Sequence, residues 1–145
     1  TDYSILRYDR TGKDSAVLKP MWGEEIQFQN CFLNDMIVEP TNEGQIIWVA
    51  AYCGLAKINP ASHDFIMYRS DPDDPISLIG NEFRGVYKDE TDIIWVTARQ
   101  GVNILDKQRS LVRQHNIFYD EYETNATVLY EDSLNNFLLF FCHAI

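Results

Sequence analysis

Cysteine has the widest chemical reach of the residue types in this chain, because a thiolate can bind a metal, attack a substrate or form a disulfide. The chain has three cysteines: Cys31, Cys53 and Cys142. They show no Cys-x-x-Cys spacing and no nearby pair of histidines. An odd number also cannot be paired completely within one chain. We therefore expect them to be buried small apolar residues, and neither metal ligands nor a redox dithiol.

The other groups that could bind a metal are the histidines and one acidic cluster. The histidines are far apart in the sequence and show no ligand spacing: His63, His115 and His143. Asp71, Asp73 and Asp74 could offer oxygen ligands to calcium, but prolines alternate with them and no glycine-hinged calcium loop follows. We expect a solvated connection there. The sequence thus predicts no metal, no cofactor and no catalytic residue.

An internal repeat organises the chain. Residues 46–51 (IIWVAA) match residues 93–98 (IIWVTA), and a glycine with an apolar neighbour follows after two further residues in both. The offset is 47 at each matched position (95 − 48 and 101 − 54). Upstream the matches continue at this offset without a gap, pairing Asn34 with Asn81, Met36 with Phe83, Ile37 with Arg84 and Asn42 with Asp89. Matches in one register over such a length indicate a duplicated structural unit.

Each unit has the pattern of four short strands separated by turn signals. We expect strands at residues 36–39, 46–51, 54–59 and 64–69, and then at residues 83–88, 93–98, 101–106 and 111–116. No segment has a sustained helical period of apolar residues, so little helix is expected. Four strands repeating every 40 to 50 residues or so are typical of β-propeller blades.

The predicted fold class is therefore all-β, built from four-stranded antiparallel propeller blades. We place a partial blade at residues 1–32, blades at 33–78 and 79–122, and a partial blade at 123–145. A closed propeller of six blades needs about 250 residues or more, so a partial propeller of about three blades is expected. The repeated tryptophan would fill the wedge between blades, and the repeated glycine would allow the tight turn before the third strand.

Two acidic residues offer a catalytic alternative. Asp35 and Glu82 follow the matched asparagines, and two carboxylates at corresponding strand starts are what a propeller hydrolase or lyase acting on carbohydrate would need. However, residues at matching positions of two repeats are expected to have the same structural role, which favours structure over catalysis. A scaffold that only mediates dimerisation is a further alternative.

A family resemblance rests on the second unit. Residues 77–83 (SLIGNEF), Asp89, residues 94–97 (IWVT), residues 101–103 (GVN) and Asp106 resemble one repeat of the two-component regulator propeller family. The first unit matches less fully, because it has Asn42 in place of the Asp. The third unit lacks the Trp.

The resemblance implies a segment of the periplasmic sensor region of a hybrid histidine kinase of the Bacteroidetes type. Such regions form ligand-sensing homodimers, and many perceive oligosaccharides from polysaccharide breakdown. The parent would be an inner-membrane protein, whereas this segment would make no membrane contact and would not itself be an enzyme.

The residues expected to contact a ligand are those that differ between matched repeats, because variation on a fixed scaffold is typical of recognition sites. Tyr52 and Arg99 lie in the turns between second and third strands, and Arg84 starts an innermost strand. A tyrosine beside an arginine would suit a sugar or a uronic acid, through stacking and charge-assisted hydrogen bonds. The net charge of −10 argues against nucleic acid as a partner.

Overall fold

The computed structural model describes residues 5–8, 15–18, 31–107, 111–116, 125–134 and 136–142. Throughout these residues the regular secondary structure is strand. The strands are β1 (Ile5–Tyr8), β2 (Ser15–Leu18), β3 (Leu33–Thr41), β4 (Gly44–Ala51), β5 (Gly54–Asn59), β6 (Asp64–Tyr68), β7 (Phe83–Lys88), β8 (Ile94–Ala98), β9 (Gly101–Asp106), β10 (Leu111–Asn116), β11 (Asn125–Glu131) and β12 (Phe137–Cys142).

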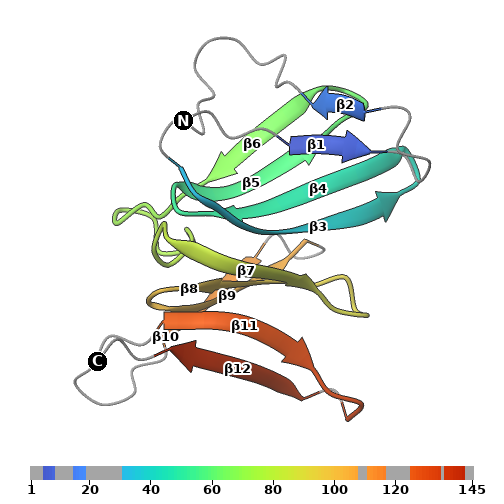
Figure 1. Cartoon of the computed structure of the whole chain (residues 1–145). Coiled ribbons are helices and arrows are strands. Elements are labelled where there is room, and N and C mark those ends of the chain that lie inside the picture. Colours follow the sequence, from blue (N-terminus) through green and yellow to red (C-terminus); the bar gives the residue numbers. More distant parts are fainter. Residues whose placement is uncertain are drawn as a thin grey trace.

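Each repeat predicted from the sequence forms one four-stranded antiparallel sheet. The first sheet has the order β3-β4-β5-β6 and the second has the order β7-β8-β9-β10, while β1–β2 and β11–β12 form hairpins. The first strands of successive units, β3, β7 and β11, lie next to one another (Figure 1). The two sheets therefore stack face to face, with their first strands forming one common edge.

The turn between the second and third strands has two residues in both sheets. Ala51 pairs with Gly54, and Ala98 pairs with Gly101. Gly54 has a φ of +143°, and a Cβ placed there would lie 2.7 Å from the carbonyl oxygen of Tyr68. The position therefore requires glycine both for its backbone conformation and for the close approach of β6, which confirms the role predicted for it.

The first strand of the first sheet is longer than the sequence predicts, since it runs from Leu33 to Thr41 rather than over residues 36–39. The reason is the turn that follows it. Thr41 pairs with Gly44 across only two residues, so the ladder of hydrogen bonds continues to the tip of the hairpin. The third strands lie where they were expected.

The prediction that the offset of 47 continues without a gap upstream of residue 46 is wrong. Ile47 pairs with Val38 in the first sheet, whereas Ile94 pairs with Lys88 in the second, so equivalent first-strand residues are 50 apart (88 − 38). The second unit has three fewer residues between these positions, five (residues 89–93) against eight (residues 39–46), because the first hairpin continues its pairing as far as Thr41 and Gly44 before its turn of two residues. The matches of Asn34 with Asn81, Met36 with Phe83, Ile37 with Arg84 and Asn42 with Asp89 are therefore not structural equivalences.

The corrected register shows a shared feature: a carboxylate at or just after the end of the first strand accepts a hydrogen bond from the repeated tryptophan. Asp89 accepts a 2.7 Å hydrogen bond from Nε1 of Trp95, and it also accepts the backbone N–H of Ile93 at 3.0 Å. Glu39 is its equivalent (39 + 50 = 89) and accepts a 2.9 Å bond from Nε1 of Trp48. Asp89 thus closes the hairpin between β7 and β8, and Glu39, not Asn42, is its counterpart.

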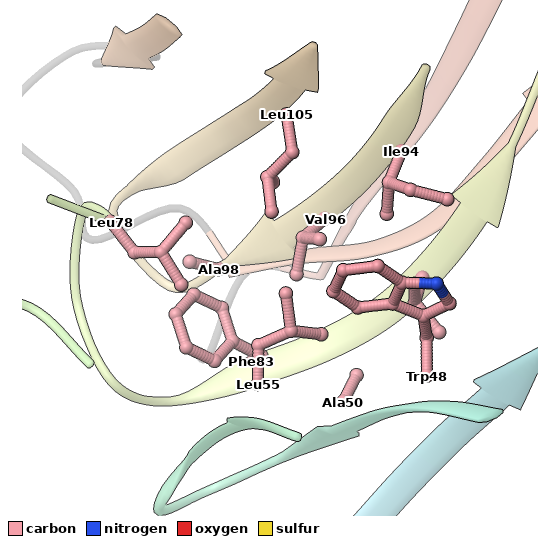
Figure 2. Close-up of a cluster of buried hydrophobic side chains, with 10 residues drawn as sticks. Trp48, Ala50, Leu55, Leu78, Phe83, Ile94, Val96, Ala98 and Leu105 are labelled. Carbon is pink, nitrogen blue, oxygen red and sulfur yellow. The ribbon is translucent and has the colours of Figure 1, made fainter. Parts of the chain in front are cut away.

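Trp48 is the centre of the core between the two sheets. Its side chain is 2% exposed and lies in one cluster with Leu55 of its own sheet and with Phe83, Val96 and other apolar residues of the second sheet. Figure 2 shows its indole directed from the first sheet toward Val96 and the strands beyond it. The tryptophan therefore fills the space between successive repeats, as the sequence predicts.

A buried polar residue fixes the connection between the sheets. Asn103, fully buried on β9, accepts the backbone N–H of Ile79 at 2.6 Å and donates to the carbonyl oxygen of the same residue at 3.3 Å. This asparagine belongs to the motif that carries the family resemblance. Its amide satisfies both backbone groups of Ile79, which a carboxylate or an apolar side chain could not do.

Glu39 also joins the two sheets electrostatically. Its Oε1 forms an ion pair with Lys107 and lies 4.0 Å from Nζ of Lys88, and both lysines belong to the second sheet or its end. Burial raises the pKa of Glu39, but the hydrogen bonds from Lys107 and Trp48 and the two positive charges outweigh it and hold the pKa below the ordinary value of 4.5.

This ion pair predicts a pH dependence of stability. Because the pKa of Glu39 is lower in the folded chain than in the unfolded chain, its contribution is complete above pH 4.5 and is lost as the pH falls through the folded value. We expect Glu39→Gln to lower the free energy of unfolding at pH 7 by about 1–3 kcal/mol and to flatten the acid limb of the profile. Urea denaturation across the pH range measures both effects. Glu43→Gln, in an exposed turn, is the control, and equal profiles for the two variants would contradict the assignment.

Candidate ligand-binding site

Two of the three residues predicted to contact a ligand meet across the boundary between the sheets. Tyr52 lies in the turn between β4 and β5, and Arg84 is the second residue of β7. The guanidinium carbon of Arg84 is 4.5 Å from the centre of the Tyr52 ring, which is a cation–π contact. The aromatic group thus comes from one repeat and the cation from the next.

A β-bulge positions Arg84 for this contact. The pairing of β7 with β8 shifts register between Phe83 and Gly85, so Arg84 is the extra residue. A bulge redirects the side chain of its extra residue, and Phe83, which is fully buried in the core, anchors the strand beside it. Asn34 occupies the same place in β3, where the register shifts between Leu33 and Asp35.

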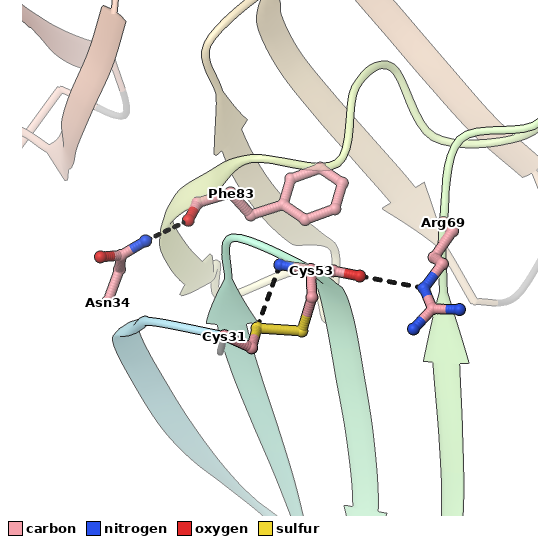
Figure 3. The surroundings of a disulfide bond; sticks show 5 residues. All are labelled: Cys31, Asn34, Cys53, Arg69 and Phe83. Atoms are coloured by element: carbon pink, nitrogen blue, oxygen red, sulfur yellow. Dashed lines mark hydrogen bonds between the residues drawn. A yellow bond between two sulfur atoms is a disulfide. The ribbon is translucent and has the colours of Figure 1, made fainter. Parts of the chain in front are cut away.

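A disulfide holds the turn that carries Tyr52. Cys31 and Cys53 are bonded, with their Cα atoms 5.5 Å apart. Figure 3 shows the bond together with the hydrogen bond of 3.0 Å from Nε of Arg69 to the carbonyl oxygen of Cys53. The backbone N–H of Tyr52 also donates to the carbonyl oxygen of Phe32 at 3.0 Å. The turn is therefore fixed on both sides.

The expectation that Cys31 and Cys53 are unpaired apolar residues is wrong, although Cys31 is indeed buried. An odd number of cysteines excludes only complete pairing and leaves one pair possible. The hairpin brings residue 53 back beside residue 31, which a count of cysteines cannot reveal. The side chain of Cys142 lies outside the described residues.

Phe32 completes the aromatic side of the cluster. Its ring meets the Tyr52 ring edge to face, with the ring centres 5.7 Å apart, and it is 56% exposed. Where an exposed aromatic ring lies beside a cation, the ring can contact the apolar face of a ligand while the cation contacts its negative charge. Phe32 could not be recognised as a site residue from the sequence, because its position follows from the disulfide beside it.

The side chain of Arg84 has one unsatisfied donor in this position. Its Nε is enclosed, and among the described residues this atom has no hydrogen-bond partner. A guanidinium prefers planar pairing with a carboxylate, and here its face is turned to an aromatic ring instead. The cluster formed by Phe32, Tyr52 and Arg84 is therefore suited chemically to an acidic ligand with an apolar face.

Arg99, the third predicted residue, lies in the equivalent turn between β8 and β9, and its backbone N–H donates to the carbonyl oxygen of Glu82 at 3.2 Å. The contacts that join Tyr52 with Arg84 do not include it. By the repeat, Arg99 corresponds to Tyr52 itself (52 + 47 = 99) and so belongs to the next boundary along the chain.

Asp35 and Glu82 are the two carboxylates of the catalytic alternative, and the structure gives them different places in their repeats. Asp35 accepts the backbone N–H of Met36 with one oxygen at 2.9 Å and that of Val86 with the other at 3.0 Å, so it ties β3 to β7. In the corrected register Asp35 corresponds to Gly85, and Glu82 corresponds to Phe32. The two carboxylates therefore do not occupy equivalent positions, and the reason for pairing them is lost.

The aspartates between the sheets form turns. Oδ1 of Asp71 accepts the backbone N–H of Asp73, and Oδ1 of Asp74 accepts that of Ile76, both at 3.0 Å. The described residues hold no group of three side chains arranged to bind a metal. No helix of membrane-spanning length and hydropathy occurs among them either.

The described chain is thus an all-β protein of stacked four-stranded antiparallel sheets. It is similar to a solved structure described as the extracellular domain of a hybrid two-component system, BT3049 from B. thetaiotaomicron. The TM-score is 0.62, with 16% sequence identity, and the likeness covers 95% of this chain and 27% of that one. No protein-family model matches the sequence. No curated protein matches it.

Proposed function

We propose that the two sheets are neighbouring blades of a β-propeller in the sensor region of a two-component system. The likeness in fold to the extracellular domain of BT3049 carries this proposal, because it extends over 95% of the chain. The chain spans about a quarter of the length of that domain, 27%, as expected for a few blades of a larger propeller. The stacked sheets with one shared inner edge support the same arrangement.

The segment works outside the cytoplasm, in the periplasm, as part of an inner-membrane sensor that forms a homodimer. The disulfide between Cys31 and Cys53 supports this location, because disulfides persist in oxidising compartments such as the periplasm. The segment itself binds and does not catalyse. Its output belongs to other parts of the sensor.

The ligand is an acidic oligosaccharide, bound at the cluster formed by Phe32, Tyr52 and Arg84. Two blades contribute to this cluster, so an occupant would contact both and could alter how they pack. Arg84 would pair with a sugar carboxylate, while the exposed ring of Phe32 would contact the apolar face of a sugar.

Calorimetric titration with a panel of acidic and neutral oligosaccharides tests this function. We expect an acidic member to bind, and both Tyr52→Ala and Arg84→Gln to weaken binding at least about tenfold, since each tenfold corresponds to only 1.4 kcal/mol or so. Arg113→Gln makes the same chemical change on the exposed surface of β10 and should bind as the parent does. Binding unchanged by Arg84→Gln would reject the site, and no binding at all would favour the dimerisation scaffold.

A further inference from the structure

A second concave site lies between the two sheets, away from the Tyr52 turn. It has a volume of about 360 Å³, which is at the lower end of the range for small-molecule sites. Its apolar wall is formed by Trp48, Tyr68, Leu105 and Val112. The residues come from β4 and β6 of the first sheet and from β9 and β10 of the second, so an occupant would contact both repeats.

The apolar wall is aromatic on one side. The Trp48 and Tyr68 rings are stacked, with their centres 6.0 Å apart and their planes at 22°. Trp48 is almost fully buried, whereas Tyr68 is only partly covered. Burial also raises the pKa of Tyr68, so its phenol stays neutral and can donate a hydrogen bond. Such a wall favours a flat apolar group over a hydrated one.

Charged groups complete the pocket. Lys57, Lys107 and Asp106 line it, so two cations face one carboxylate in a protein whose overall charge is negative. Lys107 is engaged with Glu39. Nζ of Lys57 lies 5.5 Å from the centre of the Trp48 ring. The ion pairs in the described part of the chain do not include Lys57. Lys57 can therefore meet an anionic group without giving up an existing ion pair.

From this arrangement we infer that the pocket between the sheets binds a small aryl carboxylate. The ring lies against Tyr68, Leu105 and Val112, and the carboxylate accepts a hydrogen bond from the Lys57 ammonium group. Burial of the flat ring supplies apolar contact, and the charge-assisted bond fixes its orientation. The pocket is separate from the Tyr52 cluster, and this assignment does not depend on the ligand proposed there.

Phenylacetate is the probe, and its uncharged analogue 2-phenylethanol is the matched ligand control. Both are titrated into ¹⁵N-labelled protein while the indole N–H signal of Trp48 and the backbone signal of Lys57 are followed. We expect saturable shifts of both signals with phenylacetate, and affinity at least about tenfold weaker for the alcohol. No saturable shift, or equal affinity for the two probes, would overturn the assignment.

Variants locate the site. Lys57→Met keeps the aliphatic stem over Trp48 and removes the charge, so it should weaken phenylacetate binding at least about tenfold. Arg113→Met also removes one positive charge, at an exposed position outside the pocket lining, and should leave the affinity unchanged. Val112→Trp, which fills the cavity, should abolish binding while the dispersed spectrum of the folded chain persists. Parent-like affinity in either Lys57→Met or a folded Val112→Trp would place the probe elsewhere.

Discussion

Replacing Trp48 by alanine is expected to lower the free energy of unfolding by about 3–5 kcal/mol. The side chain is 2% exposed at the centre of the cluster between the sheets, so its removal leaves a cavity that both sheets line. It also removes the indole N–H from Oε2 of Glu39, which leaves a buried carboxylate with one donor fewer. Equilibrium denaturation in urea, followed by circular dichroism, measures the loss.

Two further variants separate packing from hydrogen bonding. Trp48→Phe keeps most of the apolar contact but cannot donate to Glu39, so we expect a smaller loss than for alanine. Ile76→Ala removes an apolar side chain that is 55% exposed, and it should change stability by no more than about 0.5 kcal/mol. A Trp48→Ala loss as small as that of Ile76→Ala would mean that the sheets do not pack through this residue.

Loss of the disulfide should have the second largest effect, about 3 kcal/mol. Cys31 and Cys53 are 22 residues apart, and a bond that closes a loop of this length restricts the unfolded chain by that order. It also holds the turn that presents Tyr52. We expect the Cys31→Ala, Cys53→Ala double variant to unfold at lower urea concentration and to bind the acidic oligosaccharide proposed as its ligand more weakly.

Reduction provides the matched control for the disulfide. Dithiothreitol should destabilise the parent protein to about the level of the double variant, and it should not destabilise the double variant further. Peptide mapping of protein made under oxidising conditions should yield the linked Cys31–Cys53 peptide. Free thiols at both positions in such a sample would show that the pairing is wrong.

The strand order and most strand positions could be predicted from the sequence, because the repeated Trp and Gly mark the second and third strands of each unit. From residue 46 onward the offset of 47 holds, and the pairs Ala51–Gly54 and Ala98–Gly101 lie in equivalent turns. Turn conformation and apolar packing constrain these positions locally. They restrict which residue types can occur there, so the pattern can be recognised from the sequence.

The first strands were harder to align from the sequence, because a turn of different length separates them from the repeated motif in the two units. The offset of 47 matched Asn42 with Asp89 and so hid the equivalence of Glu39 with Asp89, since residue type and spacing both change. The disulfide was missed for a related reason: pairing depends on which segments a hairpin brings together. Tyr52 and Arg84 were selected because they vary between repeats, but their mutual contact depends on a bulge that no sequence pattern marks.

Consecutive repeats stack through Trp48, and a nuclear Overhauser spectrum tests this packing most directly. Protein labelled at tryptophan and at the methyl groups of isoleucine, leucine and valine should give cross-peaks between the Trp48 indole and methyl groups of the second sheet, among them Ile94, Val96 or Leu105. Cross-peaks from Trp48 that reach only Leu55 and other residues of its own sheet would contradict it.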